Sequence, residues 1–153
     1  MKEFALGQKN FSISRETDHS FEYVSTINDI VYINDSKATN ARHTVESINS
    51  LEAEIVLILG GDDLRTDYSW FSHVNYYNIK TVIYYGKCFS EIKAIFKKHV
   101  MVLVADNLEN AVNLAKVKAI KNQAVLFSPA CSSSDGVDNY KSRGDKFKQL
   151  VLS

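Results

Sequence analysis

The chain has 153 residues, 45% of them hydrophobic, which is enough for one domain with a substantial core. Its 18 basic and 18 acidic residues give a formal net charge of zero, which argues against nucleic acid and anionic membrane surfaces as partners. No apolar run approaches the roughly 20 residues of a membrane span, and the N-terminus lacks the apolar core of a signal peptide. We therefore expect a cytoplasmic protein with no membrane partner.

The first part of the chain predicts a leader followed by a β-hairpin and a helix. Residues 1–17 are polar with scattered apolar positions, and we expect a leader or linker ahead of a single domain at 18–153. Two β-prone runs, at 21–23 and 30–33, flank a short turn and predict the hairpin. Apolar positions at helical spacing up to residue 51 then predict a helix whose N-cap is Thr39 or Asn40.

Strands and helices alternate through the rest of the chain. Apolar runs predict strands at 55–59, 81–85, 101–105 and 124–127, and periodic segments predict helices at 67–75, 89–99, 106–117 and 140–152. This alternation is typical of an α/β fold with a doubly wound, mostly parallel sheet, here carrying an N-terminal β-hairpin. Ligands of such sheets bind beyond the carboxyl ends of the strands.

Three polar loops leave predicted strand ends and could meet in one site: 34–40, 60–67 and 128–139. The loop at 34–40 carries a carboxylate, an ammonium and two hydroxyls just before a predicted helix, an arrangement that is typical of anion-binding sites. The same residue types also favour turns and helix caps. Gly60-Gly61 is either a tight strand exit or part of a site, and the serine-rich third loop suits a carboxylate ligand or is a flexible loop. The phosphate-cradling motifs G-x-G-x-x-G and G-x-x-x-x-G-K-[ST] are absent, so the chain has no visible means of binding ATP tightly by itself.

The cysteines and histidines give no sign of metal or nucleophilic chemistry. Cys88 and Cys131 lack metal-ligand spacing, and we expect two free thiols. The four histidines are scattered, which favours surface positions or satisfied core positions over metal ligands. We assign no catalytic residue and no metal ligand. Arg65 lies in a predicted loop and Arg143 in a predicted helix, and most arginines at such positions are solvated.

Several motifs together carry a specific resemblance. They are N-D-S-K-A-T-N at 34–40, L-G-G-D at 59–62, S-P-A-C at 128–131 with Asp135, and N-Y and R-G at 139–140 and 143–144. In their order and spacing, from residue 21 to the end of the chain, they resemble the C-terminal domain of the Mur ligase family, in particular of its UDP-N-acetylmuramoyl-L-alanine:D-glutamate ligases. The resemblance implies a Rossmann-like domain of a cytoplasmic, three-domain enzyme of peptidoglycan precursor synthesis. In that family ATP, with Mg2+, activates the substrate carboxylate as an acyl phosphate, which the amine of D-glutamate attacks.

The resemblance also implies roles for individual residues. By position, Asp35 and Lys37 would contact the nucleotide. The remaining matched positions would bind D-glutamate or line its pocket: Thr39, Ser133, Ser134, Tyr140 and Arg143.

Two departures from the family pattern accompany these matches. The family usually has His-Arg where this chain has His19-Ser20, and a lysine where this chain has Leu64; the neighbouring Arg65 is the candidate replacement.

Two functions remain open at this point. The first is a domain of an ATP-dependent carboxylate-amine ligase, inactive alone, with D-glutamate, ATP and, through further domains, UDP-N-acetylmuramoyl-L-alanine as partners; ATP and Mg2+ would be bound mainly by the central domain. The alternative is a non-catalytic binding module for an acidic amino acid or nucleotide. The matched residues favour the ligase, whereas the missing cations at Ser20 and Leu64 favour the module.

Overall fold

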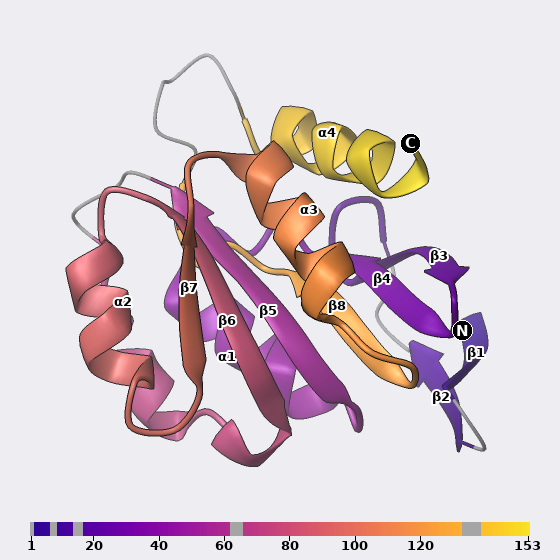
Figure 1. Cartoon of the computed structure of the whole chain (residues 1–153), viewed down its shortest axis with the longest axis horizontal. Helices are drawn as coiled ribbons and strands as arrows, with labels where there is room; N and C mark the ends of the chain where they lie inside the picture. The colour runs from indigo at the N-terminus through magenta and orange to yellow at the C-terminus, as the bar shows by residue number, and fades with distance from the viewer. Residues whose placement is uncertain (1, 7–8, 14–16, 62–65, 133–138) are drawn as a thin grey trace.

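A six-stranded sheet forms the centre of the fold (Figure 1). This computed structural model describes residues 2–6, 9–13, 17–61, 66–132 and 139–153. The strands, in their order across the sheet, are β3 (Glu22–Ile27), β4 (Ile30–Asn34), β8 (Gln123–Phe127), β5 (Glu54–Gly61), β6 (Ile79–Gly86) and β7 (Met101–Ala105). Only β3 is antiparallel to its neighbour, and every other adjacent pair is parallel, so the predicted mostly parallel sheet is confirmed.

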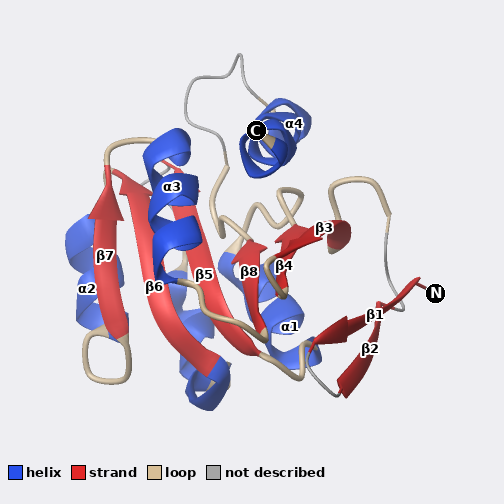
Figure 2. Cartoon of the chain, turned by 45° about the vertical axis from the view of Figure 1, so that its right-hand side comes forward, coloured by secondary structure: helices blue, strands red, loops and turns tan. Residues whose placement is uncertain are grey.

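Helices cover both faces of this sheet (Figure 2). The α-helices are α1 (Ala41–Ser50), α2 (Phe89–Phe96), α3 (Leu108–Lys118) and α4 (Tyr140–Leu152), and η1 (Tyr68–His73) and η2 (Tyr76–Asn78) are short 3-10 helices. Ile48 of α1 and Phe96 of α2 belong to the apolar core on one face, while Val112 of α3 and Phe147 of α4 belong to the core on the other. The predicted doubly wound arrangement is therefore confirmed.

Local sequence explains the hairpin between β3 and β4. Its two turn residues, Asn28 and Asp29, have φ angles of 54° and 60°. Asn and Asp adopt this left-handed conformation more easily than other residues with a side chain, and it matches the twist of two paired strands. The hairpin predicted at this place is confirmed.

Three segments differ from the sequence expectation. Residues 2–13 contain a separate antiparallel hairpin of β1 (Lys2–Leu6) and β2 (Lys9–Ile13), which the mixed polar pattern did not indicate. The predicted helix at 67–75 is the 3-10 helix η1, and the helix predicted at 89–99 ends at Phe96. The assignment of residues 1–17 as a leader or linker stays a prediction.

The strand order brings distant parts of the chain together. β8 is the last strand in sequence but lies between β4 and β5, so its carboxyl end adjoins theirs. A strand inserted in this way creates a switch point in the topology, which is where open α/β sheets bind ligands. The loops that follow β4, β5 and β8 start at this point.

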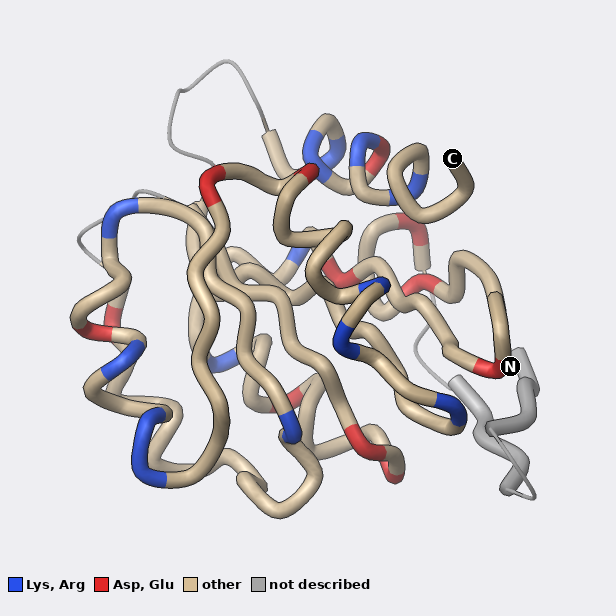
Figure 3. The backbone as a smooth tube through the Cα atoms, viewed as in Figure 1, with Lys and Arg blue, Asp and Glu red and all other residues tan. Residues whose placement is uncertain are grey.

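None of the helices that the structure describes is long and apolar enough to cross a bilayer. Basic and acidic residues are interspersed along the described backbone, and α4 carries both signs (Figure 3).

Candidate ligand site at the carboxyl ends of β4, β5 and β8

The loops that leave β4, β5 and β8 are joined by backbone hydrogen bonds. The bonds run from Asp35 N to Phe127 O (2.8 Å), Ser128 N to Ile58 O (3.2 Å), Gly60 N to Pro129 O (3.2 Å) and Ala130 N to Ala38 O (3.0 Å). Each loop therefore holds another in place, and the described parts of the three polar loops meet at one edge of the sheet.

Asp35 is a buried carboxylate, 3% exposed, at the centre of this junction. Its Oδ2 atom accepts hydrogen bonds from the hydroxyls of Ser47 and Ser128, both at 2.7 Å, and its Oδ1 atom accepts one from the Phe21 N–H at 3.0 Å. Burial raises the pKa of Asp35, while these three donors oppose that rise. In the structure, these hydrogen bonds of Asp35 connect α1, the end of β8 and the start of β3 to the loop after β4. The predicted contact of Asp35 with the nucleotide stays a prediction.

Replacing Asp35 tests this structural role. Asp35→Ala removes the acceptor of one buried and two partly buried donors and is expected to lower the free energy of unfolding by about 1 to 3 kcal/mol. Asp35→Asn is expected to cost much less, because its oxygen can accept from Phe21 while the two serine hydroxyls rotate to accept from its amide. Urea unfolding of the two variants at pH 7 measures the difference, and equal losses would contradict this account.

The same variants give a pH dependence with a defined sign. Because burial raises the folded pKa of Asp35 above its ordinary value of 3.8, the folded state retains the proton to a higher pH than the unfolded state. Its contribution to stability is therefore complete below that ordinary value and is lost as the pH rises through the folded pKa. We expect Asp35→Asn to gain stability relative to the wild type as the pH rises from about 4 to 7.

Lys37 and Thr39 lie in the turn between β4 and α1. The Lys37 N–H donates to His19 O at 2.9 Å and the Thr39 N–H donates to Lys37 O at 2.9 Å. The Lys37 side chain is exposed, and Thr39 is partly exposed. Asn40, predicted as a possible cap, accepts a hydrogen bond from the His43 N–H at 3.0 Å and caps α1. An ammonium and a hydroxyl therefore remain accessible at the loop junction.

Arg143 is the most unusual side chain of the site, because it is buried and no carboxylate of the described residues pairs with it. It is 6% exposed, and its Nη2 atom donates to Ser36 O at 3.1 Å, while Nε and Nη1 have no hydrogen-bond partner among the residues that the structure describes. No described Asp or Glu forms an ion pair with it. Burial lowers its pKa, although a guanidinium stays charged at neutral pH. A carboxylate or phosphate oxygen could accept a hydrogen bond from either of these donor atoms.

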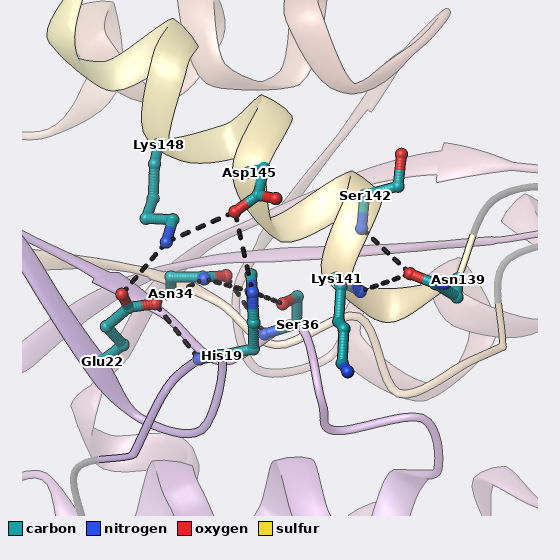
Figure 4. Close-up of polar contacts among 9 residues, drawn as sticks. All are labelled: His19, Glu22, Asn34, Ser36, Asn139, Lys141, Ser142, Asp145 and Lys148. Atoms are coloured by element: carbon teal, nitrogen blue, oxygen red, sulfur yellow. Dashed lines mark hydrogen bonds and ion pairs between the residues drawn. The ribbon is translucent and has the colours of Figure 1, made fainter.

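Tyr140 occupies the first turn of α4, one helical turn before Arg143. Its ring is half-buried and meets the His19 ring edge-on, with the centroids 6.0 Å apart. Asn139 caps the helix by accepting from the Lys141 N–H at 3.0 Å and the Ser142 N–H at 3.1 Å (Figure 4). The helix start thus brings Tyr140 and Arg143 to the β4 loop.

Arg65, Ser133 and Ser134 lie outside the described residues, as does Leu64, and their predicted roles stay predictions.

The sequence left the role of Gly60-Gly61 open, and the structure favours the tight strand exit. Gly61 has a φ of 129°, and a Cβ there would lie 2.8 Å from the Cys131 sulfur. The Gly61 carbonyl accepts a hydrogen bond from the Tyr84 hydroxyl at 3.0 Å, which in turn accepts from the Cys88 N–H at 2.6 Å. Tyr84 was not predicted as part of this region. Both cysteines are buried free thiols, as expected, and no metal-binding cluster occurs among the residues described.

The chain has close relatives among curated proteins, although no family model matches it. It is 40% identical over 144 residues to a UDP-N-acetylmuramoylalanine–D-glutamate ligase of Koribacter versatilis, covering 94% of this chain and 32% of the relative. The corresponding ligase of Chlorobium limicola is 36% identical over 151 residues, covering 99% of this chain, and hence most of residues 1–17, and 32% of the relative. The chain therefore spans about a third of the length of the curated relatives it matches.

Solved structures show the same fold. The MurF ligase from Thermotoga maritima in complex with ADP matches with a TM-score of 0.55 at 14% identity, covering 90% of this chain and 32% of that one. The UDP-N-acetylmuramate-alanine ligase MurC from Thermotoga maritima matches with a TM-score of 0.57 at 14% identity, covering 90% and 31%. By sequence and fold, the chain belongs to the Mur ligase family, in which it corresponds to the C-terminal domain of the UDP-N-acetylmuramoylalanine–D-glutamate ligases.

Proposed function

We propose that this chain provides D-glutamate binding and part of the ATP contacts in a ligase that adds D-glutamate to UDP-N-acetylmuramoyl-L-alanine during peptidoglycan precursor synthesis in the cytoplasm. The buried guanidinium of Arg143 supports this proposal, because two of its nitrogens have no partner in the described part of the loop junction. D-Glutamate has two carboxylates and ATP has three phosphates, and the oxygens of both need short, charged donors. The names of the curated relatives supply the substrate.

The accessible groups of the junction fit such ligands. The exposed ammonium of Lys37 suits a phosphate. Asp35 Oδ1 accepts one hydrogen bond from the described residues, which leaves a lone pair for a ribose hydroxyl. Thr39, Tyr140 and Arg143 would bind the amino acid or line its pocket, together with Arg65, Ser133 and Ser134. ATP and Mg2+ would be held mainly by other domains, since this chain has no phosphate-cradling motif, and the domain alone would be inactive.

A calorimetric titration of the folded chain with D-glutamate, L-glutamate and D-aspartate, extended to millimolar concentrations, tests the proposal. We expect D-glutamate to bind most tightly. Thr39→Ala should weaken D-glutamate binding about ten-fold or more, because a hydrogen bond to a charged carboxylate is lost. Ser50→Ala, at an exposed position of α1, is the control and should change nothing. Equal binding of the three amino acids would contradict the proposed substrate.

The alternative, a non-catalytic module that binds an acidic amino acid or nucleotide, is favoured by Ser20 and Leu64, which stand where the family has cations. A chimera separates the two functions: this chain replaces the matching third of the Chlorobium limicola ligase, which preserves the covalent linkage and its effective concentration. The ligase proposal predicts ADP formation that depends on D-glutamate. A folded chimera that binds D-glutamate but forms no ADP would favour the module.

A further inference from the structure

A group of polar side chains, all buried or half-buried except the exposed Asp145, joins the start of β3 and the residues before it, the end of β4 and α4 (Figure 4). We call it the His19 cluster; its members are His19, Glu22, Asn34, Ser36, Asp145 and Lys148. None of these residues was assigned a role from the sequence. His19 lies at the centre, is 8% exposed, and has a left-handed backbone with a φ of 64°.

The hydrogen bonds of Asn34 fix the protonation of the His19 ring. Asn34 Oδ1 must be an acceptor, because it faces the Ser36 N–H at 3.2 Å, so the amide nitrogen points the other way. That nitrogen donates to Glu22 Oε2 at 3.0 Å and lies 3.2 Å from His19 Nδ1. Since an amide nitrogen only donates, Nδ1 is the acceptor. The neutral ring therefore carries its proton on Nε2, which faces Asp145 Oδ1 at 3.6 Å.

The ring and main chain of His19 hold the turn that contacts Arg143. Nδ1 also lies 3.3 Å from Ser36 Oγ, and the His19 carbonyl accepts from the Lys37 N–H at 2.9 Å. The carbonyl of Ser36 is the acceptor for Arg143 Nη2, and it is the hydrogen bond that orients the guanidinium. The position of His19 thus determines where Ser36 places its carbonyl.

The backbone of α4 packs so closely against the His19 cluster that the side chains there cannot shift. A Cβ on Gly144 would lie 2.2 Å from Ser36 Oγ and 2.4 Å from His19 Nδ1, so the α4 backbone packs directly against this hydrogen bond. Buried groups in such contact cannot shift independently of one another.

We propose that His19 is a positioning residue for anion binding by Arg143: its Nε2-protonated ring accepts from Asn34 and Ser36 and thereby fixes the carbonyl that orients the guanidinium. The proposal rests on the proposed function, in which Arg143 binds D-glutamate. It concerns a residue that contacts no ligand itself.

The tautomer is tested first, without any ligand. Nitrogen-15 NMR of the imidazole in the full chain is expected to show Nε2 protonated and Nδ1 unprotonated. A neutral ring with the proton on Nδ1 would overturn the proposal, because Nδ1 could then not accept from Asn34.

Two substitutions test the positioning role. His19→Asn should retain function, because Asn tolerates the left-handed backbone and its Oδ1 can replace Nδ1 as an acceptor. His19→Ala removes the acceptor, and we expect it to weaken D-glutamate binding about ten-fold and to shift the Arg143 Nε–H resonance. His73→Ala, which replaces an exposed histidine of η1, is the control.

The readouts separate this proposal from the proposed function. If wild-type chain binds no D-glutamate, the proposed function fails, and the Arg143 resonance still decides whether His19 positions the guanidinium. If His19→Ala binds like the wild type with an unchanged resonance, the positioning role is wrong while the ligand site remains. Equal losses in the Asn and Ala variants would also overturn it, since they would indicate a structural role without need for the acceptor.

Discussion

Arg143→Met is expected to make the chain more stable and to abolish anion binding. A buried guanidinium whose Nε and Nη1 atoms have no partner and no counter-ion among the described residues is unfavourable in the unliganded fold. Methionine has a similar length and no charge, so we expect the free energy of unfolding to rise by about 1 to 3 kcal/mol. Losing a charge-assisted hydrogen bond should weaken D-glutamate binding by at least about ten-fold. Urea unfolding and calorimetric titration measure the two effects.

Arg42→Met is the matched control for this prediction. Arg42 is an exposed arginine on α1 that pairs with Glu46 at 3.0 Å, four residues further along the same helix. Exposed pairs of this kind contribute little, so its removal should change stability by no more than about 0.5 kcal/mol and leave binding unchanged. Our account of Arg143 would be contradicted if Arg143→Met were destabilised while D-glutamate still bound normally, because the residue would then serve the fold and not the ligand.

Gly144→Ala is expected to destabilise the chain even though alanine is the better helix former. Alanine gains about 1 kcal/mol of intrinsic helix propensity over glycine. The added methyl group would, however, lie 2.2 Å from Ser36 Oγ and 2.4 Å from His19 Nδ1, both buried and hydrogen-bonded. Overpacking and the broken hydrogen bonds should outweigh the gain, with a net loss of about 1 to 2 kcal/mol in urea unfolding.

A double-mutant cycle identifies the cause of this loss. Ser36→Ala removes the oxygen nearest to the added methyl group, so Gly144→Ala should cost less in a Ser36→Ala background than in the wild type. Strictly additive effects would show that the cost arises elsewhere in α4.

Periodicity and turn chemistry were sufficient to predict most elements of this fold. Asn28 and Asp29 mark the hairpin, and apolar runs such as 55–59 mark strands buried on both faces. The position of β8 between β4 and β5 could not be predicted in this way, because it depends on pairing between residues about 90 positions apart. Sequence patterns of short range contain no information about such pairing. The hairpin at 2–13 was missed because its few apolar residues were interpreted as scattered, although Phe11 and Ile13 alternate with Asn10 and Ser12.

The candidate site was predictable in residue type but not in burial. Asp35, Lys37 and Arg143 were identified from the sequence, yet an arginine of this kind is usually solvated and the structure buries it. Asp35 was taken for a ligand contact, and three donors within the chain engage it. The His19 cluster depends on a helix that begins more than a hundred residues after His19, so only the three-dimensional arrangement reveals it.

The most direct test of the central claim is to follow the Arg143 Nε–H resonance while D-glutamate is added to the full chain. This nitrogen is buried and has no partner among the described residues, so a bound carboxylate should move its resonance strongly. We predict a saturable shift with the same midpoint as the calorimetric titration, and no shift with L-glutamate at equal concentration. An unchanged resonance while D-glutamate binds, or no binding up to millimolar concentrations, would contradict the claim that Arg143 binds this substrate.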